Sequence, residues 1–268
     1  MLLKPITHKF SITGFYSAFS FSWDRHFRFN GESHNFWEIV LVSAGKVEAT
    51  EDEKVYTLEE NNMILHAPME FHRISSADGT SPSGIILSFA SAGQLPEKLK
   101  KGVFVLSESD RHEYEQIAKK IMLFREVCES DYSGQEAADL LSAFLIRLGE
   151  ETPERRLDLS FTATEYRRVV SAMAKGVLDN LTLTDFARDC SISVSYIKQL
   201  FKKHAGISPK SYYTHLRVRR AAHLLDDGSG TTEVANKMNF SSPNYFSMFF
   251  KKHMGISPSE YKKNKDKN

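Results

Sequence analysis

Polar and apolar residues alternate with a period of two along much of the first hundred residues. Such alternation is typical of β-strands that bury one face, and segments 15–23 and 36–44 show it with many aromatic and β-branched residues. Gly45 marks a turn after the second segment. Shorter apolar segments continue the series at 47–50, 55–58, 63–65, 73–75 and 85–89. Many short strands at close spacing favour an antiparallel barrel or sandwich, which we place at residues 1–106.

The hydrophobic period lengthens to three and four residues between positions 107 and 150. Two apolar stripes result, made of Tyr114, Ile117, Ile121 and Phe124 and of Ala137, Leu140, Leu141, Phe144, Leu145 and Leu148. They predict two amphipathic helices. Each stripe fits either the core of its own domain or the seam of a homodimer, and we expect this helical pair to mediate dimerisation.

A polar segment without either period, EETPERRLDLS, separates this region from the rest of the chain. It carries Pro153, and we place a linker at residues 151–163. Helical spacing resumes near Thr164, where Val169, Val170, Met173 and Val177 form one apolar stripe. The predicted fold class is therefore α+β, with an N-terminal β domain and an all-α domain at residues 164–268.

One segment of the all-α domain occurs twice. The chain reads YIKQLFKKHAGISPKSY from Tyr196 and YFSMFFKKHMGISPSEY from Tyr245, with ten of the 17 positions identical. Two copies are too few for a solenoid, which needs several stacked units to bury a continuous core. A duplicated helical module is better suited to a partner that is itself repetitive, such as duplex DNA.

Each copy follows a helix-turn-helix plan. In the first copy we expect a short helix capped by Thr184 and then a break. Ser193 at the end of the break caps a second helix from Val194 to about His204. The second copy repeats the plan with one more residue in its turn, and its second helix is predicted from Asn244 to His253. The two units span about 181–206 and 231–255.

Both units end with the sequence Gly-Ile-Ser-Pro. Gly206 and Gly255 suit a left-handed helix end, and the following Ser-Pro pairs supply a cap and a first-turn proline for the next helix. Residues 208–225 between the units are predicted as one long helix that is apolar through Tyr212, Leu216, Ala221, Leu224 and Leu225.

At these residues the sequence resembles a known family. The strings LTLTDFARDCSISVSYIKQLFKKHAGISP and TTEVANKMNFSSPNYFSMFFKKHMGISPSEY, about 100 residues of chain, are similar to the DNA-binding domain of AraC/XylS transcription regulators. The resemblance implies two helix-turn-helix units that enter successive major grooves about 34 Å apart. It also implies promoter DNA and RNA polymerase as partners, and it favours activation over repression.

Helical geometry selects the DNA-reading residues of the first unit. Tyr196, Ile197, Leu200 and Phe201 share an apolar face, so the opposite face carries Ser195, Lys198, Gln199 and Lys202. Lys198 suits guanine O6 and N7, and Gln199 suits bidentate pairing with adenine.

In the second unit, Tyr245, Phe246, Phe249 and Phe250 are expected to pack inward, and Pro243, Asn244, Ser247, Met248 and Lys251 to face outward. Asn244 is the best base reader there. Met248 stands where a cation is common in the family, so we expect weaker base reading by this unit. The remaining cations of both helices suit phosphate contacts: Lys202, Lys203, Lys251 and Lys252.

The charge distribution agrees with this division. The chain of 268 residues has a net charge of +1, but residues 164–268 hold 18 Lys and Arg against 9 Asp and Glu, while residues 1–163 hold 17 against 25. Such asymmetry points to a basic module for a polyanion and an acidic module with another role.

The β segment from His34 to Ile74 resembles the cupin-like sensor domain of the same family. His34, Glu38 and Gly45 match the spacing in the second half of the first cupin motif, and His72 falls where the second motif places a histidine. The resemblance implies a pocket formed by His34, Glu38 and His72. Strand alternation adds Phe36 to that face, and further candidates at its mouth are Arg25, His26, His66 and Arg73.

Metal-binding cupins use a further histidine, and here Glu32 stands in its place. We therefore predict no metal site and no cofactor, and we expect a small polar effector such as a sugar. Two alternatives stay open: a ligand-independent DNA-binding protein whose barrel only dimerises, and a metal-dependent cupin enzyme fused to a DNA-binding module. Because the sequence holds no phosphate loop, nucleophile elbow or paired catalytic carboxylates, we do not expect an enzyme.

The chain has no apolar run that approaches the ~18 residues of a membrane span, and its first residues lack a secretory signal. Cys128 and Cys190 show no metal-type spacing and are predicted to be free thiols of a reducing compartment. We accordingly expect a cytoplasmic protein without a membrane partner.

Overall fold

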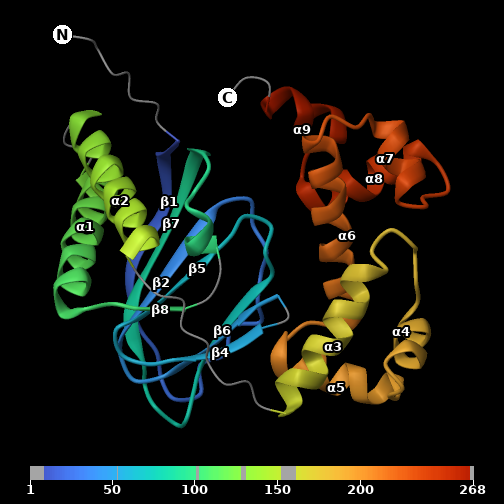
Figure 1. The fold of residues 1–268 in the computed structure, drawn as a ribbon, viewed down its shortest axis with the longest axis horizontal. Coiled ribbons are helices and arrows are strands. Elements are labelled where there is room, and N and C mark those ends of the chain that lie inside the picture. Colours follow the sequence, from blue (N-terminus) through green and yellow to red (C-terminus); the bar gives the residue numbers. More distant parts are fainter. Residues whose placement is uncertain (1–8, 53, 101–102, 128–130, 152–160, 266–268) are drawn as a thin grey trace.

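The computed structural model describes residues 9–52, 54–100, 103–127, 131–151 and 161–265. It has two parts: a β domain with two helices on its outer side, and an all-helical domain beside it (Figure 1). The predicted α+β class is confirmed.

The β domain consists of two antiparallel sheets. The larger has the order β1-β7-β2-β5-β8, with β1 (Phe10–Ser22), β2 (Trp37–Ala44), β5 (Asn62–His66), β7 (Ser83–Gly93) and β8 (Val103–Val105). The smaller has the order β4-β3-β6, with β3 (Val47–Glu51), β4 (Lys54–Leu58) and β6 (His72–Ser76). All predicted strands are present, but the sheets do not close into one barrel, because alternation specifies which face of a strand is buried and not which edges pair.

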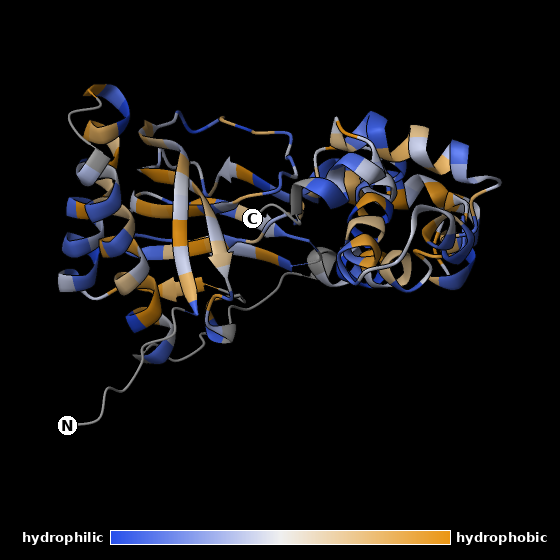
Figure 2. Cartoon of the chain, turned by 90° about the horizontal axis from the view of Figure 1, so that it is seen from above, coloured by the Kyte–Doolittle hydropathy of each residue, from blue (hydrophilic) through white to orange (hydrophobic). Residues whose placement is uncertain are grey.

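Successive side chains of β2 point to opposite faces of the sheet, so the strand contributes to two hydrophobic cores. Ile39 and Leu41 lie in a cluster with residues of the outer helices, while Val40 and Val42 lie in a second cluster between the sheets. All four side chains are fully buried. Figure 2 shows hydrophobic residues repeating along the strands, while the outer helices carry hydrophilic residues on their exposed sides.

Two helices cover the outer face of the larger sheet: α1 (Glu108–Val127) and α2 (Asp131–Glu151) (Figure 1). Ile117 and Ile121 of α1 and Leu141 and Phe144 of α2 belong to the same core as Ile39. The stripes expected at a dimer seam are thus occupied inside the domain. The large apolar side chains that these helices leave exposed are Leu123, Val127, Tyr132, Leu140 and Ile146.

The helical domain contains two units joined by a long helix. The first unit comprises α3 (Phe161–Lys175), α4 (Leu183–Asp189) and α5 (Val194–His204), and the second α7 (Thr231–Lys237), α8 (Pro243–Met254) and α9 (Pro258–Lys265). The joining helix is α6 (Pro209–Asp226), which runs between them in Figure 1. It contributes Tyr212 and Leu216 to the first core and Ala221 and Leu225 to the second. The predicted connecting helix is confirmed.

Side-chain caps fix the helix starts. Ser193 and Ser208 cap α5 and α6 as predicted, and Gly206 and Gly255 adopt the left-handed conformation with φ of 72° and 78°. The prediction for α4 was wrong by two residues. Its cap is Thr182 rather than Thr184, because Asp185 lies at the third helical position and completes a capping box with Thr182.

The predictions for the linker and for the two cysteines can be compared with the structure only in part. Residues 152–160 of the predicted linker and Cys128 lie outside the described residues, whereas Cys190 is a buried free cysteine. Helix α2 ends at Glu151 and α3 begins at Phe161. No helix in the described ranges has the length and apolarity needed to cross a bilayer.

The neighbouring leucines of α2 test the assignment of its stripe. Leu141 is fully buried and Leu140 is 38% exposed. We expect Leu141→Ala to lower the free energy of unfolding by about 2–5 kcal/mol, because it removes buried methyl groups and leaves a cavity. Leu140→Ala is the matched control and should cost less than ~1 kcal/mol. Urea denaturation of the two variants measures this, and equal losses would contradict an intradomain stripe.

Candidate nucleic-acid interface and effector site

Helix α5 presents a polar face above a buried apolar one. Ile197 and Phe201 are fully buried, and Leu200 is 2% exposed. The predicted readers lie on the exposed face: Ser195, Lys198, Gln199 and Lys202. At the start of the helix the Ser193 hydroxyl accepts a hydrogen bond from the backbone of Tyr196 at 3.1 Å. The capped helix thus holds its polar side chains outward in a row suited to a DNA groove.

Helix α8 has a similar polar face with fewer hydrogen-bonding side chains. Asn244, Lys251 and Lys252 are exposed, and Met248 is 71% exposed. The Ser247 hydroxyl donates to the carbonyl of Pro243 within the same helix at 2.9 Å. This unit therefore offers mainly Asn244 for base reading.

Tyr245 does not pack inward as predicted. Its side chain is 56% exposed, while Phe246 beside it is fully buried. The ring of Phe240, from the turn before α8, contacts the rings of Phe246 and Phe249 at centroid distances of 5.2 and 5.1 Å. Phe240 therefore fills the edge of the core where Tyr245 was expected. Tyr245 instead lines a cavity between the two units.

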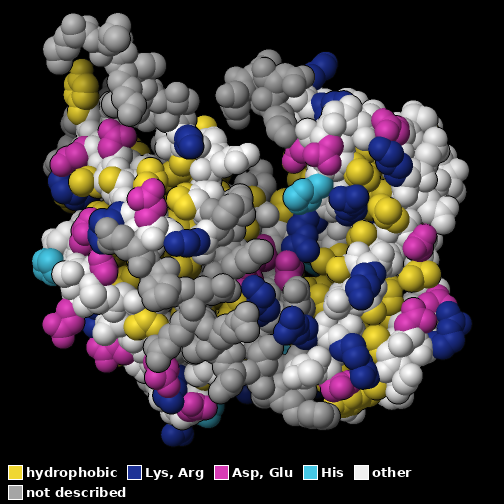
Figure 3. Space-filling view, viewed as in Figure 1, with side chains coloured by type: hydrophobic (Ala, Val, Ile, Leu, Met, Phe, Trp, Pro, Cys, Tyr) yellow, Lys and Arg dark blue, Asp and Glu magenta, His cyan; other side chains and the backbone are white. Residues whose placement is uncertain are grey.

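A cavity of about 1000 Å³ lies between the two units. Lys198 of α5, Lys210 of α6 and Tyr245 of α8 are among its lining residues. Side chains of both recognition helices thus face one hollow. Figure 3 shows Lys and Arg side chains distributed over the helical half of the viewed face.

Arg217 of α6 joins the two units and was not among the residues predicted from the sequence. Its side chain donates to Asn180 Oδ1 at 2.5 Å and to the carbonyl of Met238 at 2.6 Å, and its guanidinium lies 4.5 Å from the ring centre of Phe240. Asn180 belongs to the first unit and Met238 to the second. In the sequence, the signal for this contact is only an arginine next to Leu216 of the predicted long helix.

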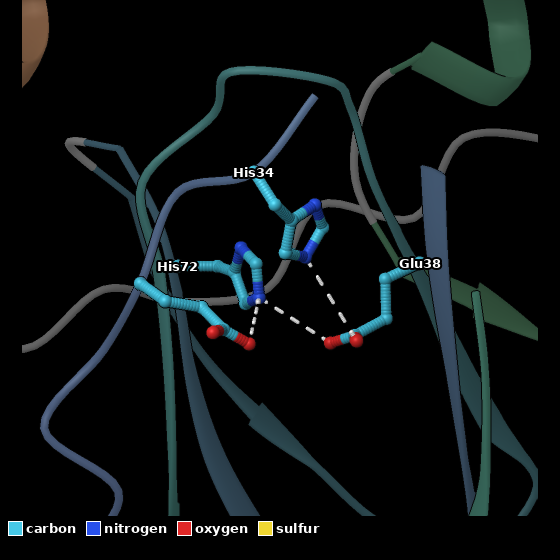
Figure 4. A group of neighbouring side chains, drawn as sticks. His34, Glu38 and His72 are labelled. Atoms are coloured by element: carbon cyan, nitrogen blue, oxygen red, sulfur yellow. Dashed lines mark ion pairs between the residues drawn. The ribbon is translucent and has the colours of Figure 1, made fainter. Parts of the chain in front are cut away.

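The candidate effector residues converge at one end of the β domain (Figure 4). Nε2 of His72 lies 3.3 Å from one oxygen of Glu38, and Nε2 of His34 lies 3.9 Å from the other. Glu38 comes from β2 and His72 from β6, whereas His34 precedes β2 and is not part of a strand. The predicted meeting of these three side chains is present in the structure.

Glu32 joins the same cluster, at the position where metal-binding cupins have a further histidine. The backbones of Glu32 and His72 exchange hydrogen bonds of 2.9 and 3.0 Å, which place the two residues opposite each other. One Glu32 oxygen lies 3.9 Å from Nε2 of His72. One donor atom from each of Glu32, His34, Glu38 and His72 lies within 4.8 Å of the others.

Neighbouring groups orient the cluster. The His34 ring stacks on Phe36 at 3.7 Å, and its Nδ1 lies 3.0 Å from the Phe36 carbonyl. The Ser88 hydroxyl donates to Glu38 at 3.1 Å. Phe36 therefore lies beside the site as predicted, but it supports His34 from the loop before the strand.

Burial decides the charge of the cluster. It lowers the pKa of His34 to about 4, with a further contribution from His72, so His34 is neutral at pH 7. Burial raises the pKa of Glu38, but His72, His34 and Ser88 outweigh that effect and hold its pKa below the ordinary value. The cluster thus presents a carboxylate and an imidazole with an available lone pair.

The four residues predicted at the mouth of the pocket do not lie there. Arg25 is exposed on a turn, where its Nε donates to His26 at 3.1 Å, and no contact in the described structure joins either residue to the cluster. His66 is not at the rim: it is fully buried and stacks on His72 at 4.2 Å. Arg73 points away from the cluster, because alternation along β6 turns it to the face opposite His72.

Arg73 instead contacts the helical domain. Its Nη1 donates to the carbonyls of Lys203 and His204, at 2.5 and 3.2 Å, at the end of α5. The ring of Phe71, on the other side of His72, packs against Tyr212 of α6 at 5.1 Å. The strand that carries His72 therefore also holds the first helix-turn-helix unit.

A second contact comes from Asp52 at the tip of the β3–β4 hairpin. Its carboxylate accepts hydrogen bonds from Arg219 at 2.5 Å and from the Tyr212 hydroxyl at 3.4 Å. The Asp52 carbonyl accepts another from Tyr166 of α3 at 3.1 Å. In the sequence, the signal for this interface is only the charged segment between the predicted strands 47–50 and 55–58.

Comparison with known proteins matches both halves. Residues 186–264 match the model of a helix-turn-helix domain, and residues 18–92 match the model of the AraC-like ligand binding domain. The uncharacterized HTH-type transcriptional regulator YbfI of Bacillus subtilis is 24% identical over 80% of each chain. The HTH-type transcriptional activator RhaR of Mannheimia succiniciproducens is 21% identical over 82% of this chain and 83% of its own.

Among solved structures, ToxT of Vibrio cholerae is 15% identical, with a TM-score of 0.39, over 94% of this chain and 96% of its own. The two family models fall on the two halves whose geometry is described above. The chain belongs to the AraC/XylS family of DNA-binding transcriptional regulators, with an AraC-like ligand-binding domain before its helix-turn-helix domain.

Proposed function

We propose that this regulator reads promoter DNA through α5 and α8, and that a small ligand held by His34, Glu38 and His72 controls that reading. It acts as an activator, as the name of the RhaR relative supports. Contact with RNA polymerase is a further part of the proposal. A homodimer on DNA is part of the proposal, with the exposed side of α1 and α2 as its contact, because their inner stripes are buried.

The observation that carries the proposal is that side chains at the start of β6 point alternately to the cluster and to the helical domain. His72 faces the cluster, while Phe71 and Arg73 on either side of it face the helical domain. Successive residues of a strand are rigidly linked, so a displacement of His72 moves its neighbours. A ligand that repositions His72 therefore acts on the contact that holds α5.

The contact on α5 is at the helix end where a cation binds best. The last carbonyls of a helix have no partner within the helix and carry partial negative charge. Arg73 donates to two of these carbonyls, and the Thr50 hydroxyl donates to the carbonyl of His204 at 3.2 Å. In this docked arrangement the first unit is held by the β domain through main-chain groups of its recognition helix.

Docking of the first unit on the β domain restricts its position, whereas DNA binding requires both units to fit two successive grooves. A protein whose binding-competent arrangement is only partly populated shows reduced apparent affinity. Release of the first unit from β6 and Asp52 lets it adjust to the DNA. We therefore assign the docked arrangement to the weaker DNA-binding state.

The base readers are tested by single substitutions in the full chain, on a site selected from a random duplex library. Lys198→Ala and Gln199→Ala should each weaken specific binding by roughly 1–3 kcal/mol and change binding to unrelated DNA little, because both side chains are exposed on the reading face. Fluorescence anisotropy gives both affinities. Equal losses on the two DNAs for Gln199→Ala would contradict its role as a base reader.

Lys252 of α8 provides the matched test of a phosphate contact. It is exposed in the last turn, where its charge suits the backbone and not the bases. Lys252→Ala should weaken specific and unrelated DNA nearly equally and reduce the slope of log K against log salt by about one. An effect on the selected site alone would make Lys252 a base reader instead.

Control by the β domain is tested with Arg73→Gln. This change removes the charged contact with the end of α5, so we expect at least a threefold gain in affinity for the selected DNA. Arg111→Gln is the matched control, because the described partners of Arg111 are Glu60, Asn61 and Glu115, all within the β domain and its helices. No difference between the two variants would show that the docked contact does not restrain DNA binding.

A further inference from the structure

We propose that Glu32, His34, Glu38 and His72 bind a divalent transition-metal ion. The ion is then the ligand, or the anchor of the ligand, that the β domain senses. This inference rests on the proposed function for its regulatory consequence, but the site itself is argued from geometry alone.

The donor set fits such an ion. Two imidazole nitrogens and two carboxylates are a mixture that first-row divalent metals accept, with imidazole favouring zinc, iron or nickel and carboxylate favouring manganese. Ligand atoms that lie about 2.0–2.2 Å from one ion are no more than ~4.4 Å apart. The four groups already lie within 4.8 Å of one another, so small side-chain movements complete the shell.

Two buried ring nitrogens are directed into the cluster without a hydrogen-bond partner. Within the described chain, Nε2 of His34 and Nε2 of His72 are buried and make no hydrogen bond, and the His72 side chain is 1% exposed. The Nδ1 atoms of the two rings lie near backbone carbonyls, of Phe36 at 3.0 Å and of Glu70 at 3.4 Å. A proton on Nδ1 leaves the Nε2 lone pair free, as in metal-bound histidines whose other nitrogen is held by a second group.

The carboxylates are held in a comparable way. Ser88 donates to one oxygen of Glu38, and the backbone bridge to His72 fixes the position of Glu32. The Glu32 side chain is 50% exposed, whereas that of Glu38 is 9% exposed. The site therefore has one open side, through which an ion enters and a water or a further ligand completes its coordination.

The space available favours an ion over the sugar expected from the sequence. The four side chains lie at 3.3 to 3.9 Å from one another in their closest pairs, which leaves no room for a sugar ring between them. Inward from Glu38 the domain is filled by buried Val40, Ile74 and Ile86. The expectation that Glu32 excludes a metal is revised, because a carboxylate at that position is itself a ligand.

The test uses the full chain without a histidine tag, stripped with chelator and titrated with Zn²⁺, Mn²⁺ or Co²⁺ alone. We expect one ion per chain by calorimetry, visible absorption bands of bound Co²⁺, and a higher melting temperature with the metal. Glu32→Ala should weaken binding at least tenfold without unfolding the protein, since its side chain is half exposed. His72→Gln should abolish the Co²⁺ bands.

Glu60→Ala and His26→Ala are the matched controls, because these are exposed carboxyl and imidazole groups outside the cluster. Neither should change the affinity. No stoichiometric binding, or equal affinity of the wild type and Glu32→Ala, overturns the metal site. Binding that leaves the affinity for selected DNA unchanged supports the site and overturns control by the ion. A gain in DNA affinity from Arg73→Gln without any metal binding leaves the proposed function standing with another ligand.

Discussion

The rigid alternation of side chains along β6 links the two parts of this protein. Phe71, which directly precedes the strand, and Arg73 contact the helical domain, while His72 between them lies in the cluster of the β domain. Neither contact can change its position independently, since a strand residue cannot turn over without a shift in register. The register itself is fixed by pairing of β6 with β3 from Val47 to Glu51. In the proposed function, communication between the domains therefore needs no long pathway, only a movement of one short strand.

Buried polar groups around His72 keep this strand in place. His66 stacks on His72, and its Nδ1 lies 3.3 Å from Glu70. Burial lowers the pKa of His66 and, together with Glu51 and Asp52, raises the pKa of Glu70 well above its ordinary value. Both shifts favour a neutral hydrogen-bonded pair over an ion pair. The pair lies between the cluster and the Asp52 contact, so the turn from β5 to β6 is held at both ends.

The sequence was most informative where a local rule applied, although the cap of α4 and the packing of Tyr245 were predicted wrongly. Period-two and period-three-to-four patterns predicted the strands and helices, and Ser193, Ser208, Gly206 and Gly255 lie where capping rules place them. His34, Glu38 and His72 were located by the resemblance to the cupin-like sensor domain. What local rules could not predict are contacts between residues far apart in the chain. Arg73 to Lys203 spans 130 residues and Arg219 to Asp52 spans 167, and no periodicity reports such pairs. The position of Glu32 beside His72 could not be predicted for the same reason, because the pairing of these two residues is a tertiary feature.

The repeated units share a sequence pattern but not an equal position in the molecule. The first unit carries the two proposed base readers, Lys198 and Gln199, both exposed, and Arg73 binds the end of its recognition helix. The second unit presents Met248 in place of such a reader, and the contacts described between the domains do not involve its recognition helix. Arg217 nevertheless fixes the second unit to the first through Asn180 and Met238. In the proposed function, control exerted on α5 therefore acts directly on the unit with most of the proposed base readers. It reaches the other unit through α6, so that one regulatory contact governs both.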